Sequence, residues 1–280
     1  MRLHFSSASA LRWITLVAVA IVTPVTFTGC GSSSAFSNPA TNPAAATSKA
    51  PTASMLTETS SVPPILLFNG TGTLSADVSA WETILKAHNL TYATANSSEM
   101  NSMTETKLKT YKLFIVPGGN SATIGKYLTN TATTNIHNAV QAGLHYYGGC
   151  AGGFFASDSI YNDLDLTTGV WFNVYHNGGK GTGLTAVEIS YPNGTKLDQV
   201  WEDGPEFTGW GSIVAKYPDS TPAVVEGKYG LGWVILCGFH PEAPASWRGK
   251  LTFTTSAAVD NAYAGTLVIA ALNGTSLPHF

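Results

Sequence analysis

Charged side chains are scarce in this 280-residue chain. Lys, Arg, Asp and Glu together make up 11% of the residues, well below the roughly 25% of a typical soluble domain. The net charge is -3 and no segment is rich in Lys and Arg, so the chain lacks the basic surface that gathers nucleic acid. We therefore expect no nucleic-acid partner.

Long hydrophobic runs are also absent at the start of the chain. The apolar run of residues 13–22 is too short to span a bilayer as a stable helix. Arg2 and Arg12 precede it, and "FTGC" closes the segment at Cys30. This order resembles a bacterial lipoprotein signal, which implies that residues 1–30 are a signal peptide and that Cys30 is lipidated. An ordinary secretory signal with a stray cysteine is the alternative, and both interpretations predict an exported protein.

Residues 31–62 have few large apolar side chains and are rich in Ser, Thr, Ala, Pro and Asn. Such a segment cannot bury enough surface to offset its chain entropy. We predict a flexible tether that joins a membrane lipid anchor in the cell envelope to one domain, residues 63–280.

Short apolar runs alternate with helical patterns in the first half of this domain. The predicted strands cover residues 65–70, 90–95, 112–119 and the run before Cys150, and the predicted helices cover residues 75–89 and about 121–142. This alternation predicts an α/β fold with an open, mostly parallel sheet and helices on both faces. The second half is predicted to be β-rich, with strands near 183–190, 196–204, 212–218, 222–230 and 232–240, and to close with a helix at 256–274.

A cysteine follows one of the predicted strands in the run "HYYGGCAGGFF". Gly148 and Gly152 flank Cys150 as glycines flank the serine of a G-x-S-x-G nucleophile elbow, in which a sharp strand-to-helix turn leaves no room for larger side chains. Such a turn presents the sulfur at the carboxyl end of the sheet, where ligands bind in α/β folds. The start of the following helix also favours the thiolate. Cys150 is therefore our candidate nucleophile.

The candidate base lies in "CGFHPE", directly after the last predicted strand. His240 leaves the strand end, and Glu242 is placed to hold the imidazole in one tautomer. A cysteine nucleophile needs such a base, and the base needs an orienting group. We predict a catalytic triad of Cys150, His240 and Glu242.

Together these segments resemble the class I glutamine amidotransferase superfamily, whose members carry a PGG strand end, a G-x-C-x-G elbow and a late H-P-E. "VPGGNSATIGKYL", "YYGGCAGGFFAS", "DGPEF" and "VAKYPDSTPAVVEGKYGLGWVILCGFHPE" resemble, within it, the amidotransferase-like N-terminal domain of biotin–protein ligases, over roughly residues 64–245. The resemblance implies a flavodoxin-like sheet, the same triad, and an oxyanion hole from the backbone N–H groups of Gly119 and Ala151. It also suggests a substrate pocket that includes Gly118, Phe154, Asp203 and Gly204.

Phe154 departs from the glutaminase pattern. True glutaminases usually have Gln or His four residues after the nucleophile, and phenylalanine cannot hydrogen-bond a glutamine substrate. Neither a synthetase domain nor the catalytic domain of a biotin ligase is recognisable in the sequence. We therefore expect neither glutamine hydrolysis for biosynthesis nor biotin transfer.

Structural roles for the same residues stay open at this point. Cys150 could be a small buried residue in a tight turn, or could form a disulfide with Cys237, since export permits disulfides. His240 could be a structural histidine, and Glu242 a salt-bridge partner or a helix cap. The acidic "WEDGPEF" (201–207) could bind a cation or an amine, or could be a solvated loop.

We expect no cofactor and no metal. The glycine-rich "VYHNGGKGTG" lacks the ending of a phosphate-binding loop, and His176 has no partner at metal-ligand spacing. The sequence favours a cysteine-nucleophile hydrolase or amidase that acts on an unidentified amide or ester in a small-molecule or peptide-like substrate. A non-catalytic ligand-binding module on the same fold is the alternative, and the sequence leaves the oligomeric state open.

Overall fold

The computed structural model describes residues 62–176, 183–249 and 251–280. The predicted signal peptide, its Cys30 and the predicted tether up to residue 61 lie outside the described residues. None of the helices in the described ranges is both long and apolar enough to cross a membrane.

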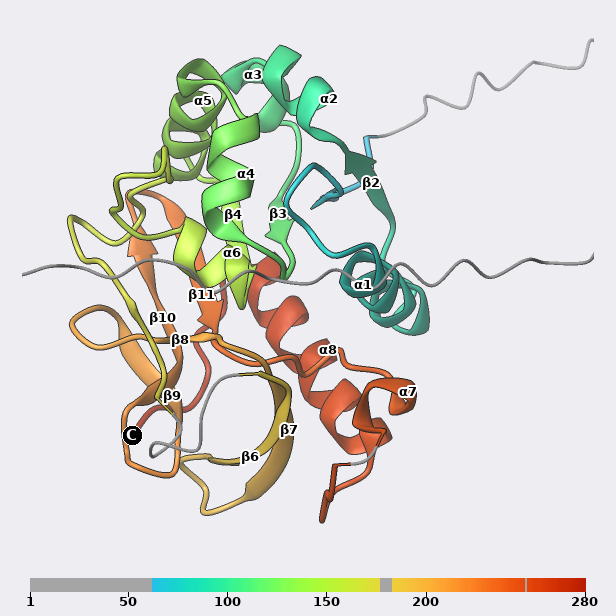
Figure 1. The fold of residues 1–280 in the computed structure, drawn as a ribbon. Coiled ribbons are helices and arrows are strands. Elements are labelled where there is room, and N and C mark those ends of the chain that lie inside the picture. The colour runs from blue at the N-terminus through green and yellow to red at the C-terminus, as the bar shows by residue number, and fades with distance from the viewer. Residues whose placement is uncertain (1–61, 177–182, 250) are drawn as a thin grey trace, which may run out of the picture. The chain divides into compact units, whose positions relative to one another are not determined.

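A nine-stranded mixed sheet forms the centre of the described domain, with strand order β2-β1-β3-β4-β11-β10-β9-β6-β7 (Figure 1). Its parallel half consists of β2 (Tyr92–Ala95), β1 (Ile65–Phe68), β3 (Leu113–Val116), β4 (His145–Gly149) and β11 (Gly232–Cys237). Its antiparallel half consists of β10 (Pro222–Tyr229), β9 (Ser212–Lys216), β6 (Thr185–Ser190) and β7 (Lys196–Trp201). The predicted α/β class, with an open, mostly parallel part and a β-rich second half, is confirmed.

The inner parallel strands β1, β3, β4 and β11 are buried on both faces because helices cover both. Along β1 the side chains alternate: Ile65 and Leu67 belong to one core cluster, and Leu66 and Phe68 to the other. The first cluster includes side chains of α1 (Ser75–Ala87) and α8 (Ala257–Asn273), and the second includes side chains of α5 (Asn130–Gln141) and α6 (Ala151–Phe155). The carboxyl ends of β3, β4 and β11 are left free for a site at one edge of the sheet.

The single helix predicted at about 121–142 is wrong. The segment forms two helices, α4 (Ser121–Tyr127) and α5, because Leu128 and Thr129 are extended. The Thr129 side chain accepts a hydrogen bond from the Ala132 N–H and so caps the second helix. The Asn162 side chain donates to the carbonyls of Gly125 and Leu128, which holds the break in place.

Three short helices and a two-stranded ribbon were not predicted individually. Two of these helices, α2 (Ser97–Ser102) and α3 (Glu105–Leu108), lie between β2 and β3, and α7 (Ala245–Arg248) precedes α8. The strands β5 (Asn173–Val174) and β8 (Pro205–Glu206) pair antiparallel beside the main sheet. They are too short to give a period, so pattern alone does not find them.

Candidate active site

Cys150 occupies a sharp turn between β4 and α6. Its backbone has φ +46° and ψ -104°, a conformation that is uncommon for a residue with a side chain and typical of functional turns. The flanking glycines are sterically required, because a Cβ on Gly148 would lie 2.4 Å from the Gly152 carbonyl oxygen, and a Cβ on Gly152 would lie 2.1 Å from the Val116 carbonyl oxygen. The predicted elbow is thus present, for the predicted steric reason.

His240 lies beyond the end of the neighbouring strand β11. Its N–H donates to the Val200 carbonyl at 2.8 Å, which ties it to β7. The N–H of Cys150 donates to the Cys237 carbonyl, also at 2.8 Å. Backbone pairing therefore fixes the nucleophile and the base against each other at the carboxyl edge of the sheet.

The His240 ring meets two buried carboxyl groups at its Nδ1 atom. The Glu242 Oε1 atom lies 2.8 Å from Nδ1, and the Asp77 Oδ2 atom lies 3.5 Å from it. The relative exposures of His240, Glu242 and Asp77 are 4%, 3% and 0%. The predicted contact between His240 and Glu242 is present, and it leaves the Nε2 atom free of Glu242.

Asp77 is a site residue that the sequence reasoning missed. It lies in the first turn of α1, far from the other site residues in the chain, and its Oδ2 accepts a 2.5 Å hydrogen bond from the Gly118 N–H. One signal was present: Asp77 lies on the same helix face as Val78 and Trp81, which are core residues. Burying an acidic side chain on an apolar helix face destabilises the fold unless a hydrogen-bond or charge partner lies beside it.

The three groups shift one another's proton affinities. Burial alone lowers the pKa of His240, but the neighbouring Cys150 and Glu242, and then Asp77, raise the pKa well above its ordinary value. Burial and the charge of Asp77 raise the pKa of Glu242 to about 8. Burial opposes ionisation of Asp77, yet the hydrogen bond and charge of His240 hold its pKa below the ordinary value. The imidazole of His240 is therefore protonated at neutral pH.

The two cysteines of the described domain are free. The disulfide alternative for Cys150 and Cys237 is therefore not formed in this structure. The Cys150 Sγ atom donates to the Glu202 carbonyl at 3.6 Å, and the Cys237 Sγ atom donates to the Phe239 carbonyl at 3.4 Å. Burial raises the pKa of the Cys237 thiol far above its ordinary value, so it stays protonated in the core.

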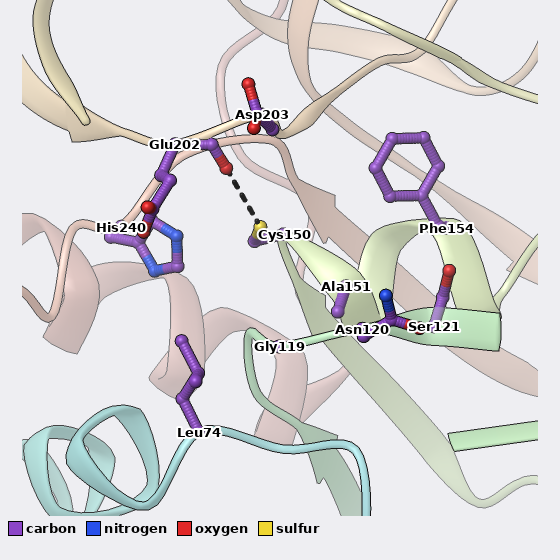
Figure 2. Close-up of a pocket in the computed structure, with 10 residues that line it drawn as sticks. All are labelled: Leu74, Gly119, Asn120, Ser121, Cys150, Ala151, Phe154, Glu202, Asp203 and His240. Atoms are coloured by element: carbon purple, nitrogen blue, oxygen red, sulfur yellow. Dashed lines mark hydrogen bonds between the residues drawn. The ribbon is translucent and has the colours of Figure 1, made fainter. Parts of the chain in front are cut away.

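A cavity of about 380 Å³ opens above the thiol (Figure 2). Its size lies at the lower end of the range for small-molecule sites, roughly 300–1,000 Å³. It is lined by Leu74, Gly119, Asn120, Ser121, Cys150, Ala151, Phe154, Glu202, Asp203 and His240. Glu202 and Asp203 are the acidic members of this set and His240 is the basic one, and no Lys or Arg belongs to it.

The residues expected around the substrate divide into two groups. Phe154 and Asp203 line the cavity, and Asp203 has a positive φ of +47°. Gly118 and Gly204 do not line it: the Gly118 N–H is turned toward Asp77, and Gly204 packs where a Cβ would lie 1.9 Å from the Gly238 carbonyl oxygen. Gly118 instead leaves room for the Asp77 and His240 side chains, and Gly204 leaves room for the backbone at Gly238.

Gly119 and Ala151 lie in the cavity wall where an oxyanion hole was expected. Within the described ranges, neither backbone N–H donates to another backbone group. Gly119 also has a φ of +147°, and a Cβ there would lie 2.1 Å from the Gly72 carbonyl oxygen, so only glycine fits. Two free N–H groups beside a thiol are the donors that a tetrahedral intermediate needs.

Asp77, His240 and Glu242 are also the groups close enough to consider as metal ligands, with one donor atom of each within 4.8 Å of the others. The 2.8 Å separation of the His240 Nδ1 and Glu242 Oε1 atoms is a hydrogen-bond distance. Two ligands of one tetrahedral zinc ion, each about 2.05 Å from it, would be about 3.3 Å apart. The separation fits a hydrogen-bonded histidine better than two ligands of a tetrahedral zinc ion.

Comparisons with known proteins place similar sequences and folds beside this chain. Residues 64–171 match the family described as the N-terminal part of biotin–protein ligase. This segment contains the Cys150 elbow and ends before His240 and Glu242. The chain is 28% identical over 162 residues to the biotin–protein ligase of Schizosaccharomyces pombe, a match that covers 48% of this chain and 26% of the yeast protein. It is 26% identical over 163 residues to the pyridoxal 5'-phosphate synthase subunit PdxT of Pseudothermotoga lettingae, over 55% of this chain and 81% of the PdxT chain.

Solved structures give the same fold. A glutamine amidotransferase superposes with a TM-score of 0.50 at 20% identity, over 64% of this chain and 90% of its own. A putative GMP synthase protein from Thermoplasma acidophilum superposes with a TM-score of 0.51 at 10% identity, over 76% of this chain and 96% of its own. The chain therefore has a class I glutamine amidotransferase-like fold, and residues 64–171 are similar to the N-terminal part of biotin–protein ligase.

Proposed function

We propose that this protein is an exported hydrolase or amidase that uses Cys150 to attack an amide or ester, held at the cell envelope by a lipid on Cys30. The carrying observation is the convergence of an elbow cysteine and a carboxylate-bound histidine on one cavity. Buried titratable groups with mutually shifted pKa values are typical of catalytic sites. The fold similarity favours this class of reaction, but a fold alone does not identify the substrate.

The arrangement supports a two-stage acyl transfer. The Cys150 thiolate attacks the carbonyl carbon, and the resulting oxyanion accepts hydrogen bonds from the Gly119 and Ala151 N–H groups. Protonated His240 then gives a proton to the leaving amine or alcohol, and the carbon–nitrogen or carbon–oxygen bond breaks. In the second stage neutral His240 takes a proton from water, the hydroxide attacks the thioester, and Cys150 leaves as the thiolate.

The cavity wall argues against free glutamine as the substrate. Phe154 offers no hydrogen bond, and Glu202 and Asp203 would repel the carboxylate of a free amino acid. Asn120 and Ser121 provide neutral polar groups on the opposite wall. We propose a neutral or amine-bearing acyl compound, either a small molecule or a short peptide-like chain.

A substrate screen tests this function. Wild type is compared with Cys150→Ala and His240→Ala on amides, esters and glutamine, and thermal melting controls for folding. We expect each variant to lose nearly all turnover, and the double variant to be little worse than either single one, because groups that act as a unit are not additive. Turnover that survives Cys150→Ala contradicts the mechanism.

One observation favours a second candidate, a binding module without turnover. In the structure the hydrogen bond of the Cys150 thiol goes to the Glu202 carbonyl, and the cysteine is only 6% exposed. A resting thiol held this way is not aimed at a substrate. Tight binding of a screened compound without its conversion would select this candidate.

A further inference from the structure

Two carboxyl groups, not one, converge on the histidine of this site. Asp77 comes from α1 and Glu242 from the segment after β11, and both approach the Nδ1 atom of His240. One oxygen of each group, Asp77 Oδ1 and Glu242 Oε2, is buried and has no hydrogen-bond partner within the described structure. A triad accounts for one of these carboxyl groups and leaves the other unexplained.

We propose that Asp77 and Glu242 share one proton and one negative charge beneath His240, so that Asp77 is a second positioning residue of the site. The proposal deepens the proposed function and rests on it for the role of His240. It predicts that either carboxyl group can hold the imidazolium when the other is neutral.

The energetics of burial support a shared proton. Two ionised carboxylates a few ångströms apart, both almost completely buried, repel each other and have no water to compensate. One proton removes the repulsion and turns an orphaned carboxyl oxygen into a donor. The remaining negative charge pairs with protonated His240, so that Asp77, Glu242 and His240 together are neutral.

The surroundings supply no other compensating charge. The titratable groups that act on Glu242 and His240 are Asp77 on α1, Cys150 at the elbow, and Cys237 and Tyr147 on the neighbouring strands. Burial raises the pKa of both Tyr147 and Cys237. Both side chains therefore stay uncharged at neutral pH. The charge of the Asp77–Glu242 pair is balanced by the imidazolium of His240.

Asp77 also joins the base to the wall that holds the expected oxyanion donors. Its Oδ2 atom accepts from the Gly118 N–H, next to Gly119, and a Cβ on Gly118 would lie 2.2 Å from that oxygen and 2.6 Å from the His240 Cε1 atom. The loop of residues 70–74 pairs with the same segment through two backbone hydrogen bonds. The Leu74 N–H donates to the Gly118 carbonyl, and the Asn120 N–H donates to the Gly72 carbonyl. One carboxylate thus positions two parts of the site.

The first test measures alkylation of Cys150 by iodoacetamide between pH 5 and 9, which requires no substrate. The variants are Asp77→Asn, Glu242→Gln and the double variant, all nearly isosteric, with Glu82→Gln on the exposed side of α1 as the matched control. At pH 7 we expect the alkylation rate of each single variant to stay within about threefold of the wild-type rate. The rate of the double variant should fall by about tenfold or more, because the imidazolium loses its hydrogen bond to a charged group. The midpoint of the double variant's pH profile should move to higher pH.

The proposal is overturned if Cys150 is alkylated as slowly in Glu242→Gln as in the double variant, because Asp77 would then carry no part of the negative charge that holds the imidazolium. It is equally overturned if the double variant reacts like wild type. Thermal melting of every variant separates these outcomes from loss of folding, and Asn at position 77 still offers an acceptor to the Gly118 N–H.

The second test detects the proton directly. Infrared spectra at pH 7 are recorded in an Asp163→Asn background, because burial raises the pKa of Asp163 to about 7 and its carboxyl band would otherwise overlap. In this background, the protein with both Asp77 and Glu242 should show the carbonyl stretch of a protonated carboxyl group, and each single variant should lose it because the remaining group ionises. A spectrum without this band when both groups are present, or a band that persists in both variants, overturns the proposal. Failure of the proposed function would appear separately, as wild type without turnover or as Cys150 alkylation that does not respond to His240→Ala.

Discussion

Asp163 shows what burial does to a carboxyl group outside the active site. Its Oδ2 atom accepts a hydrogen bond from the Ser159 hydroxyl, while its Oδ1 atom is buried and unpaired among the described residues. Burial raises the pKa of Asp163 to about 7; the hydrogen bond opposes the shift and the charge of Asp158 adds to it. Asp163 therefore binds a proton in the folded protein at pH values where the unfolded chain has released it.

This shift predicts a loss of stability as the pH rises. Between about pH 4, near the ordinary aspartate pKa, and about pH 7, the folded state binds more protons than the unfolded state, so the free energy of unfolding falls. Asp163→Asn removes this term, and its Tm relative to wild type should rise by several degrees from pH 4.5 to pH 7.5, at roughly 2–4 °C per kcal/mol. Melting curves at the two pH values measure it, with exposed Glu188→Gln as the control; parallel curves for wild type and Asp163→Asn would refute it.

Single residues also mark the limit of prediction from sequence. Cys150, His240 and Glu242 could be found because each stands in a short motif whose spacing has a steric or chemical reason. Asp77 could not be assigned a role, because its partners Gly118 and His240 come from other elements and meet it only in the folded chain. The family resemblance that indicated the triad contained no place for it.

At the scale of elements, the β4–α6 elbow makes the sharpest prediction. Gly152→Ala places a Cβ 2.1 Å from the Val116 carbonyl oxygen, so α6 must move away from β3. We expect it to destabilise the fold by about 1–3 kcal/mol, a usual cost of overpacking, and to displace Cys150.

Gly149→Ala is the matched control three residues earlier. A Cβ there lies 3.6 Å from the nearest atom of Tyr147, an ordinary van der Waals contact. Denaturant unfolding of both variants measures the difference. Equal stability of the two would contradict the steric account of the elbow.

Elements differ in how well the sequence predicts them. The strands β1, β3 and β4 are short, mostly apolar runs that end at or within two residues of a glycine or proline, so their positions follow from the local sequence. The break between α4 and α5 was not predicted, although threonine is a preferred N-cap residue. Asn101 and Asn162 bind the backbone around Thr129, and these partners come from other parts of the chain. Tertiary hydrogen bonds decided the break.

At the scale of the whole molecule, the sheet changes character between β11 and β10. β11 is the last parallel strand and carries His240 at its end, while β10 begins an antiparallel half that ends at β7. β7 in turn pairs with His240 through Val200. The β-rich half therefore helps to hold the base in place, which a count of predicted strands could not reveal.

The lipid anchor is a prediction about the whole protein. Cys30→Ser should abolish lipid attachment and move the protein from the membrane fraction to the soluble fraction, because the lipid that anchors the protein is attached to this cysteine. Fractionation and mass spectrometry of the mature N-terminus measure this. Membrane association that is unchanged in Cys30→Ser would show that residues 1–30 are not a lipoprotein signal.

The central claim is that Cys150 is a nucleophile activated by His240. Limited iodoacetamide treatment at pH 7, followed by mass spectrometry, tests it most directly by comparing Cys150 with the buried Cys237 in wild type and in His240→Ala. We predict that wild type is labelled first at Cys150 and that His240→Ala slows this labelling about tenfold or more, since the thiolate loses its charged partner. Labelling of Cys237 first, a disulfide between the two cysteines, or a Cys150 rate that does not depend on His240 would contradict the account.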